Sequence, residues 1–359
     1  MDCCMMPELE LAEWGNQLKA QMNGRRYPLN GMFELTDRCN LGCVHCFINQ
    51  PAASQDARAH ELSTTQVKEI LDQVADAGCL FLTLTGGEIL IRTDFEEIYR
   101  HAKQKGFLLT LFTNGTMITQ RIADMFEAYR PRSIELTMYG ATRETYEAVT
   151  GVPGSYDRFR RGIELLLERG LPVKLKTMLI TLNFHELSAM RAFAESLGLS
   201  FRFDGLLWPR FDGSKNIRTQ QIRLEDLVAL DDMDPNRMLE WKRIAEQYSG
   251  ELTRAERVFF CGAGMYNFHI DSHGRMSICT MTRQPNFSIL ENGFLEAWSH
   301  IGELRKLKRQ KETICQTCTL GALCQQCPGW SQAAHGDNET PVEFVCKLAH
   351  LRNTQISGV

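Results

Sequence analysis

Short apolar segments alternate with amphipathic segments between residues 32 and 207. The apolar segments predict β-strands, and the amphipathic ones repeat their apolar residues at the spacing of helices that cover one face of a sheet. Six such repeats in roughly 175 residues predict a parallel sheet with right-handed crossovers, whereas a closed eight-unit barrel takes roughly 250 residues. We therefore expect an α/β fold, a partial (β/α)6 TIM-like barrel. The predicted strands are residues 32–36, 80–85, 107–113, 133–137, 173–180 and 199–203.

Three of the intervening segments carry helix signatures. Ser63 followed by Gln66 has the pattern of a capping box, and Thr93 followed by Glu96 predicts a second helix that starts in the same way. Both starts precede residues with helical periodicity. The expected buried faces are Val67, Ile70, Leu71 and Val74 in the first helix, and Phe159, Ile163 and Leu166 in a third.

The pattern changes after residue 207. Residues 212–249 are rich in charge and predict a helical bridge, and residues 267–271 and 276–280 flank a turn sequence that predicts a β-hairpin. A helix is expected over residues 293–309, with Phe294, Trp298, Ile301 and Leu307 on one side, and a loop-rich cysteine cluster ends the chain. The expected regions are an N-terminal extension (1–31), the barrel (32–207), the bridge (208–257) and a C-terminal domain (258–359).

Composition and charge narrow the class of protein. The chain has 359 residues, of which 43% are hydrophobic and 23% charged, as expected for a globular enzyme. A net charge of -4 provides no basic field for a nucleic-acid partner. The first residues lack the pattern of a signal peptide, and no apolar run reaches transmembrane length. We therefore expect a cytoplasmic protein without a membrane partner.

The cysteines carry the candidate chemistry. Thirteen cysteines, an odd number with tight spacings, favour metal ligation over a disulfide framework. Cys39, Cys43 and Cys46 follow the first predicted strand, where active-site loops of such barrels lie. Three thiolates leave one iron of a [4Fe-4S] cluster open for a small-molecule chelate. A zinc site is the alternative, but it lacks a paired CxxC and an obvious fourth ligand.

This CxxxCxxC motif resembles that of the radical S-adenosylmethionine (SAM) superfamily. The resemblance implies that the open iron binds the methionine part of SAM and that electron transfer from the cluster releases a 5′-deoxyadenosyl radical. Further SAM contacts are implied for residues at the ends of successive strands, although each of these positions also suits a turn, packing or surface role. These residues are His45 near the adenine, Gly86, Gly87 and Glu88 near the methionine amino group, Asn114 and Thr137 for the ribose or carboxylate, and more weakly Arg158 and Asn183.

Seven cysteines near the C-terminus resemble the SPASM domain, which carries auxiliary [4Fe-4S] clusters in radical SAM enzymes that modify peptides and proteins. The family usually has three residues between the last two cysteines of its central group, whereas this chain has only Gln325 and Gln326. Two cubes need eight ligands, so the first auxiliary cluster is expected to keep an iron that is open or bound by another residue. A pair of zinc-ribbon-like sites is the alternative. The implied ligands are Cys261, Cys279 and Cys327 for the first cluster, and Cys315, Cys318, Cys324 and Cys346 for the second.

The leading functional hypothesis is a maturase that abstracts hydrogen from a ribosomally made peptide, to form a thioether, a C–C crosslink or another C–H modification. Its candidate partners are the peptide, an electron donor such as flavodoxin or ferredoxin, and a separate peptide-recognition protein. A sulfatase maturase is disfavoured because Thr280 stands where those enzymes place an Asp. A small-molecule dehydrogenase, a haem-side-chain enzyme and a zinc-stabilised binding module stay open. Cys3, Cys4 and Cys79 match no cluster pattern and are expected to be free thiols.

Overall fold

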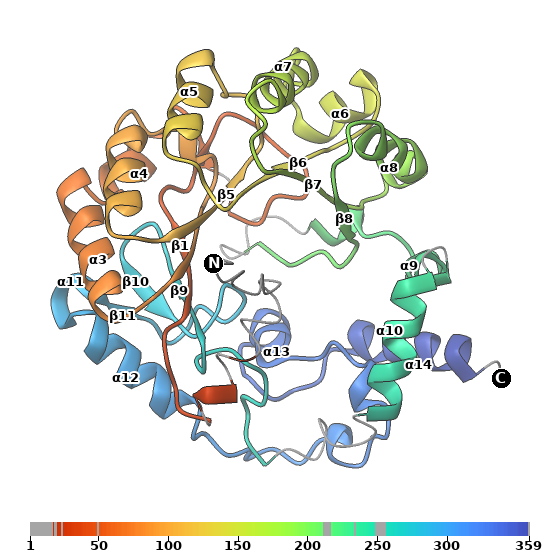
Figure 1. The fold of residues 1–359 in the computed structure, drawn as a ribbon. Coiled ribbons are helices and arrows are strands. Elements are labelled where there is room, and N and C mark those ends of the chain that lie inside the picture. The colour runs from red at the N-terminus through yellow and green to blue at the C-terminus, as the bar shows by residue number, and fades with distance from the viewer. Residues whose placement is uncertain are drawn as a thin grey trace, which may run out of the picture.

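One nine-stranded sheet organises the computed structural model, which describes residues 17, 20–22, 24–48, 50–210, 217–232, 235–247 and 256–357. Six strands pair in parallel in the order β1-β4-β5-β6-β7-β8, and the helices between them form an outer layer (Figure 1). The predicted partial barrel is confirmed. Its strands are β1 (Asn30–Glu34), β4 (Phe81–Thr85), β5 (Leu108–Thr113), β6 (Ser133–Thr137), β7 (Val173–Met178) and β8 (Phe201–Asp204).

The helices of the barrel bury the faces that the sequence predicts. Ser63 caps α3: its hydroxyl accepts from the Gln66 backbone N–H, and the Gln66 side chain accepts from the Ser63 N–H at 2.9 Å. The predicted apolar faces of α3 and α7 are buried in the core. The barrel helices are α3 (Thr64–Asp76), α4 (Phe95–Gln104), α5 (Gln120–Ala128), α6 (Arg143–Thr150), α7 (Ser155–Leu167) and α8 (Leu187–Ser196).

The predicted start of the second helix at Thr93 is wrong. Helix α4 begins one residue later, with Asp94 as its N-cap residue and no side-chain hydrogen bond to the first turn. The Asp94 carboxylate instead accepts from the Arg92 guanidinium at 2.6 Å and from the Thr64 hydroxyl at 2.6 Å. A buried arginine from outside the helix therefore takes the acceptor that would otherwise cap it.

Alternate residues of the strands face opposite layers. Phe33, Leu84 and Leu136 are buried against the helices, as the pleat requires. Their strand neighbours, such as Glu34 and Glu135, lie on the opposite face, which lines the interior of the partial barrel. We call this interior the lumen. It is unusually polar for the inside of a sheet, so it provides groups that can bind a substrate.

The predicted C-terminal hairpin is confirmed, and it continues the barrel sheet. β9 (Asn267–Ile270) pairs antiparallel with β10 (Arg275–Ser277) and in parallel with β1, with Met32 beside His269. The sheet therefore crosses the boundary predicted between the barrel and the C-terminal domain. The expectation that Leu307 shares the buried face of its helix is wrong, because α12 (Phe294–Leu304) ends earlier and Leu307 is 44% exposed.

The remaining elements are short strands and helices beside the barrel and the helices near the C-terminus. α9 and α10 fall within the predicted bridge, of which residues 211–216, 233–234 and 248–255 lie outside the described residues, as do Cys3 and Cys4. None of the helices within the described ranges is long and apolar enough to cross a membrane. These elements are β2 (Arg38–Cys39), β3 (Gln50–Pro51), α2 (Gln55–His60), α9 (Leu224–Asp232), α10 (Pro235–Gln247), β11 (Phe287–Ser288), α11 (Ile289–Asn292), α13 (Pro328–His335) and α14 (Glu343–Ser357).

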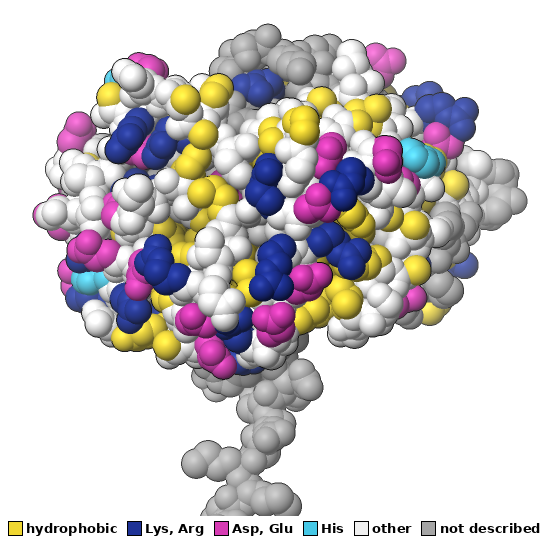
Figure 2. Space-filling view, turned by 90° about the horizontal axis from the view of Figure 1, so that it is seen from above, with side chains coloured by type: hydrophobic (Ala, Val, Ile, Leu, Met, Phe, Trp, Pro, Cys, Tyr) yellow, Lys and Arg dark blue, Asp and Glu magenta, His cyan; other side chains and the backbone are white. Residues whose placement is uncertain are grey.

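The outer surface of the helical layer carries charges of both signs. Figure 2 looks onto the edge where α5, α6 and α7 lie, and lysine and arginine side chains there are interspersed with acidic ones. The Arg143 guanidinium pairs with Asp157, and that of Arg161 lies 3.3 Å from the Glu164 carboxylate. The described residues of this face therefore form no extended patch of a single charge, and such exposed pairs contribute little to stability.

Candidate functional site

Cys39, Cys43 and Cys46 lie together on the loop that follows β1. Burial raises the pKa of the Cys39 thiol to about 12, and it also raises that of Cys43, to which the nearby Cys46 and Cys39 add. The backbone N–H of Leu41 and the Asn114 amide point at the Cys39 sulfur, at 3.4 and 3.7 Å. Three close, half-buried thiols with N–H donors suit a bound cluster, because cationic iron would stabilise thiolates that the free protein disfavours.

Glu88 is a fully buried carboxylate beside this loop. Its oxygens accept from the Thr113 hydroxyl at 2.7 Å and from the backbone N–H groups of Asn114 and Leu90 at 2.8 and 3.1 Å. Burial raises the pKa of Glu88, and these three hydrogen bonds oppose the rise. The carboxylate thus ties the end of β5 to the turn after β4. Because three hydrogen bonds already occupy the Glu88 carboxylate, few of its acceptor sites remain for the SAM amino group. Contact between Glu88 and that amino group stays a prediction.

Gly86 and Gly87 allow the turn after β4 to touch the turn after β1. A Cβ at Gly86 would lie 2.2 Å from the Thr36 carbonyl oxygen, and one at Gly87 would lie 2.2 Å from that of Arg38. Because the two turns are so close, the Gly87 N–H donates to the Thr36 carbonyl at 2.7 Å and the Glu88 N–H donates to the Arg38 carbonyl at 2.9 Å. The glycines therefore make room for the backbone that leads into Cys39.

Replacing Gly86 by alanine is expected to lower the free energy of unfolding by about 1–3 kcal/mol. The residue has a φ of +132°, which disfavours any Cβ, and the added methyl would also meet the Thr36 oxygen. Gly106→Ala is the matched control, because Gly106 has a φ of +88° but open space around it. Urea unfolding of the two variants separates backbone strain from collision. A loss in Gly86→Ala no larger than in Gly106→Ala would show that the collision is relieved.

His45 and Tyr139 form an aromatic wall next to the cysteines. Their ring centroids are 5.8 Å apart, and burial lowers the pKa of His45 to about 4, so the imidazole is neutral. The buried Nδ1 of His45 has no hydrogen-bond partner among the described residues. An unpaired buried nitrogen is costly unless another group binds it. This arrangement fits the predicted position of His45 beside a bound nucleoside.

The structure places the other predicted SAM contacts in different surroundings. The amide of Asn114 bonds to Asn40 at 2.9 Å, and Thr137 lies at the end of β6. Asn183 is fully buried, and its amide bonds to the Ile180 N–H and to the carbonyls of Tyr139 and Met178. Its side chain thus holds the loops after β6 and β7 together. Arg158 is exposed on α7, so its role in binding stays the weakest of these predictions.

The far side of the lumen contains a second polar cluster that the sequence analysis did not identify. The Lys176 ammonium lies over the Phe112 ring and 3.7 Å from the Glu135 carboxylate, which also bonds to Arg202 at 2.6 Å. Burial lowers the pKa of Lys176 well below its ordinary value; the charge of Glu135 opposes this shift and that of Arg202 adds to it. Lys176 pairs with Thr137 across the sheet, so it lies near the predicted SAM site.

We expect Lys176 to lose its proton at a lower pH than an ordinary lysine, whose pKa is about 10.4. The shift is toward the neutral amine because burial penalises the ammonium more than Glu135 stabilises it. Carbon-13 NMR of protein with labelled lysine side chains measures this pKa, and Lys176→Met assigns the signal. Glu135→Gln removes the stabilising charge and is expected to lower the pKa further. Titration of the assigned signal near the ordinary value would contradict the expected burial.

A buried ion-pair network joins the lumen to the hairpin. The Arg283 guanidinium binds both oxygens of Glu34, at 2.9 and 2.6 Å, and His269 Nε2 lies 3.2 Å from the same carboxylate. His269 Nδ1 faces the Ser277 hydroxyl at 2.9 Å. Because Arg283 and Ser277 flank Cys279, the network fixes this candidate ligand relative to β1. Glu34 directly after the apolar pair Met32 and Phe33 was the sequence signal for it.

A cleft of about 540 Å³ opens beside the first cysteine loop. The Arg210 guanidinium, which lines it, donates to the Cys46 carbonyl at 3.2 Å, so the cleft is adjacent to the candidate cluster loop. Its volume lies in the range of ligand pockets, which is roughly 300–1,000 Å³. The lining comes from the cysteine loop (Phe47, Ile48), the chain after β8 (Trp208 to Arg210), the hairpin turn and following loop (Asp271, Arg275, Met281, Arg283) and α13 (Gln332, Ala333).

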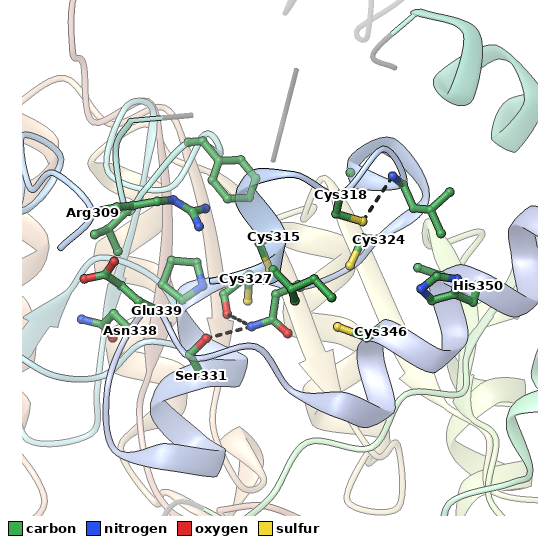
Figure 3. Close-up of a pocket in the computed structure, with 18 residues that line it drawn as sticks. Arg309, Cys315, Cys318, Cys324, Cys327, Ser331, Asn338, Glu339, Cys346 and His350 are labelled. Carbon is green, nitrogen blue, oxygen red and sulfur yellow. Dashed lines mark hydrogen bonds between the residues drawn. The ribbon is translucent and has the colours of Figure 1, made fainter. Parts of the chain in front are cut away.

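The seven C-terminal cysteines form the two groups that the SPASM resemblance implies. Burial raises the pKa of Cys324 to about 11, and Cys346, Cys315 and Cys318 are close enough to add to this shift. Burial likewise raises the pKa of Cys327 to about 11, with contributions from Cys279 and Cys261. Figure 3 shows Cys315, Cys318, Cys324 and Cys346 lining one pocket, with Cys327 at its side.

The spacing of these thiols bears on the zinc alternative. Within the described ranges, no three His, Cys, Asp or Glu side chains are close enough to hold a single metal ion. A structural zinc site needs four ligands at roughly 2.0–2.3 Å from one ion. Which residues bind metal stays a prediction.

Comparison with known proteins identifies the barrel. Residues 33–194 match the Radical SAM superfamily. The chain is 27% identical to the AdoMet-dependent heme synthase of Methanosarcina barkeri, over 85% of this chain and 92% of that protein. It is 29% identical to the mycofactocin maturase MftC of Mycolicibacterium smegmatis, over 83% of this chain and 77% of that protein.

A solved structure shares the whole fold. The crystal structure of Streptococcus suis SuiB bound to its precursor peptide SuiA aligns with a TM-score of 0.69 at 16% identity, and the alignment covers 96% of this chain and 83% of SuiB. At this identity the similarity establishes the fold alone. It extends across both the barrel and the cysteine-rich region.

Proposed function

Because residues 33–194 of this chain match the Radical SAM superfamily, we propose that it is an enzyme that modifies a peptide by abstracting a hydrogen atom from it. The family implies a [4Fe-4S] cluster and SAM, which together supply a 5′-deoxyadenosyl radical. Cys39, Cys43 and Cys46 would hold this cluster. The neutral ring of His45 and the turn at Gly86 to Glu88 would position SAM beside it.

The cleft beside Cys46 carries this proposal. It joins the loop of the SAM cluster to the lumen-facing network, because Arg283 both lines the cleft and binds Glu34. A substrate in the cleft would thus lie between the predicted radical source and the loop of Cys279. The walls are polar and aromatic, which suits a peptide segment with mixed side chains. The maturase name of one relative and the peptide-bound neighbour support this substrate class.

We further propose that the two C-terminal thiol groups hold auxiliary [4Fe-4S] clusters. Seven thiolates leave one cube short of a ligand, and Cys261, Cys279 and Cys327 form the incomplete set. The Thr282 N–H lies 3.3 Å from the Cys279 sulfur, a contact that would stabilise its thiolate. The cluster at Cys279, next to the cleft, would accept the surplus electron after hydrogen abstraction or bind a substrate thiolate.

A haem-type reaction is the second candidate, because the relative named as a heme synthase is covered over 92% of its length. Two substrates distinguish the candidates: a peptide encoded by a short reading frame beside the gene, and iron-coproporphyrin III. Reconstituted enzyme is incubated anaerobically with SAM, a strong reductant and each substrate in turn. We expect the peptide to change mass in step with 5′-deoxyadenosine formation. Turnover of the porphyrin with no change in the peptide would overturn the peptide proposal.

A further inference from the structure

Gln325 and Gln326 are the two residues that separate Cys324, of the second thiol group, from Cys327, of the first. The inference drawn here rests on the proposed auxiliary clusters. If both clusters are bound, this segment sets their spacing, because each of its ends is a ligand to a different cluster. The conformation of two residues therefore matters for electron transfer between the clusters.

Groups from three other segments, two side chains and one backbone N–H, hold the glutamines. The Gln326 amide donates to the Ser331 hydroxyl at 2.8 Å and accepts from the Val342 N–H at 3.0 Å. The Gln325 amide oxygen accepts from the Arg352 guanidinium at 2.9 Å. Arg352 lies on α14, the helix that also carries Cys346. One arginine thus contacts the inter-cluster segment from an element that itself carries a ligand of the second group.

Arg352 is 2% exposed and lies among charges of both signs, because Asp231, Arg237 and Asp204 are all close enough to affect its pKa. Its guanidinium lies 3.1 Å from the Asp231 carboxylate of α9 and 4.2 Å from the centroid of the Trp241 ring. Arg237 lies 2.6 Å from the other oxygen of Asp231. Two guanidinium groups therefore share one carboxylate. Arginine stays charged at any working pH, so the positive charge here is permanent.

A fixed positive charge changes the reduction potential of a nearby iron–sulfur cluster. Reduction adds one negative charge to the cluster, and a cation in a buried site stabilises that charge with little screening. Net charge and hydrogen bonds around a cluster are the established means of setting its potential. We propose that Arg352 is a positioning residue that fixes the Gln325–Gln326 segment and raises the reduction potential of the cluster held by Cys315, Cys318, Cys324 and Cys346.

Two variants that change the local charge in opposite directions test this proposal. Arg352→Gln removes the positive charge, so the potential of one auxiliary cluster is expected to fall. Asp231→Asn removes the negative partner, so the same potential is expected to rise. Each shift should change the ratio of reduced to oxidised cluster at a fixed potential by about tenfold, or about 59 mV for one electron. Structural damage alone would not move the two variants in opposite directions.

The potentials are measured by electron paramagnetic resonance during redox titration of the anaerobically reconstituted full chain. Added SAM identifies the signal of the SAM-binding cluster, which serves as the internal reference. Arg352→Lys keeps the positive charge. Its ratio of reduced to oxidised cluster at a fixed potential is expected to stay within about threefold of that of the unmodified protein. Arg169→Gln is the matched control. It also removes a largely buried arginine that pairs with a carboxylate, Asp124, but this pair lies by α5 and α7, on the opposite side of the molecule from α14.

Unchanged auxiliary potentials in both charge variants, with iron content intact, would overturn the role of Arg352. Shifts of both variants in the same direction would overturn it as well. If Arg352→Gln does not retain its second cluster, Asp231→Asn and Arg352→Lys decide the question. Unmodified protein that binds only the SAM cluster would instead overturn the auxiliary-cluster proposal itself, so the two failures are distinguishable by the iron content.

Discussion

Replacing Cys43 by alanine is expected to abolish 5′-deoxyadenosine formation and to remove about four irons per chain. Cys43 lies between the other two thiols of its group, and both contribute to the raised pKa of its thiol. Two remaining thiolates cannot hold a cube that already has one open iron. Iron analysis and chromatographic detection of 5′-deoxyadenosine measure the two losses on the same sample.

Cys79→Ala is the matched control for this variant. Cys79 is a buried thiol in the core, with its sulfur 3.6 Å from the Leu29 carbonyl, and it is distant in sequence from every cysteine group. It is expected to retain full iron content and SAM cleavage, apart from any effect of lower stability. Full iron and normal 5′-deoxyadenosine formation in Cys43→Ala would show that this thiol is not a ligand.

Replacing Glu34 by alanine is expected to lower the free energy of unfolding by about 3–5 kcal/mol, as for other buried pairs that lose one partner. The carboxylate is 2% exposed and contacts both Arg283 and His269, so its removal leaves a guanidinium that is only 19% exposed without its counter-charge. Urea unfolding measures the loss. Glu164→Ala is the control, because its pair with Arg161 is exposed on α7. A loss below about 1 kcal/mol in Glu34→Ala, as typical of surface pairs, would contradict the buried network.

The same network predicts a pH dependence. Burial alone would raise the pKa of Glu34, but the charges and hydrogen bonds of His269 and Arg283 lower it to about 2. The unfolded carboxyl has a pKa of about 4.3. The stabilising contribution of Glu34 is therefore fully present above the unfolded value and is lost as the pH falls from about 4.3 toward 2. The stability difference between the unmodified protein and Glu34→Gln should shrink across this range.

Local signals accounted for most of the barrel. The strands were predictable because their apolar residues alternate with turn-forming segments, and α3 was predictable because Ser63 and Gln66 complete a capping box within four residues. The cysteine spacing of the family predicted which cysteines belong to each of the two C-terminal thiol groups. The structure brings the same cysteines together. Their roles as ligands are not tested by geometry alone.

The features that sequence could not predict depend on distant partners. Glu34 meets Arg283, which is 249 residues away, and Arg352 meets Asp231, which is 121 residues away. The start of α4 depends on Arg92. Its guanidinium donates to the Asp94 carboxylate and also to the Leu35 carbonyl, which is 57 residues away in the sequence. The pairing of β9 with β1 likewise joins segments that no local pattern relates. Each of these depends on the final packing.

The metal content of the anaerobically reconstituted protein, measured together with SAM cleavage, tests the central claim most directly. Three [4Fe-4S] clusters predict about twelve irons per chain with an equal amount of sulfide, and 5′-deoxyadenosine formation from SAM under a strong reductant. Zinc in place of iron, with no 5′-deoxyadenosine formed, would contradict the account.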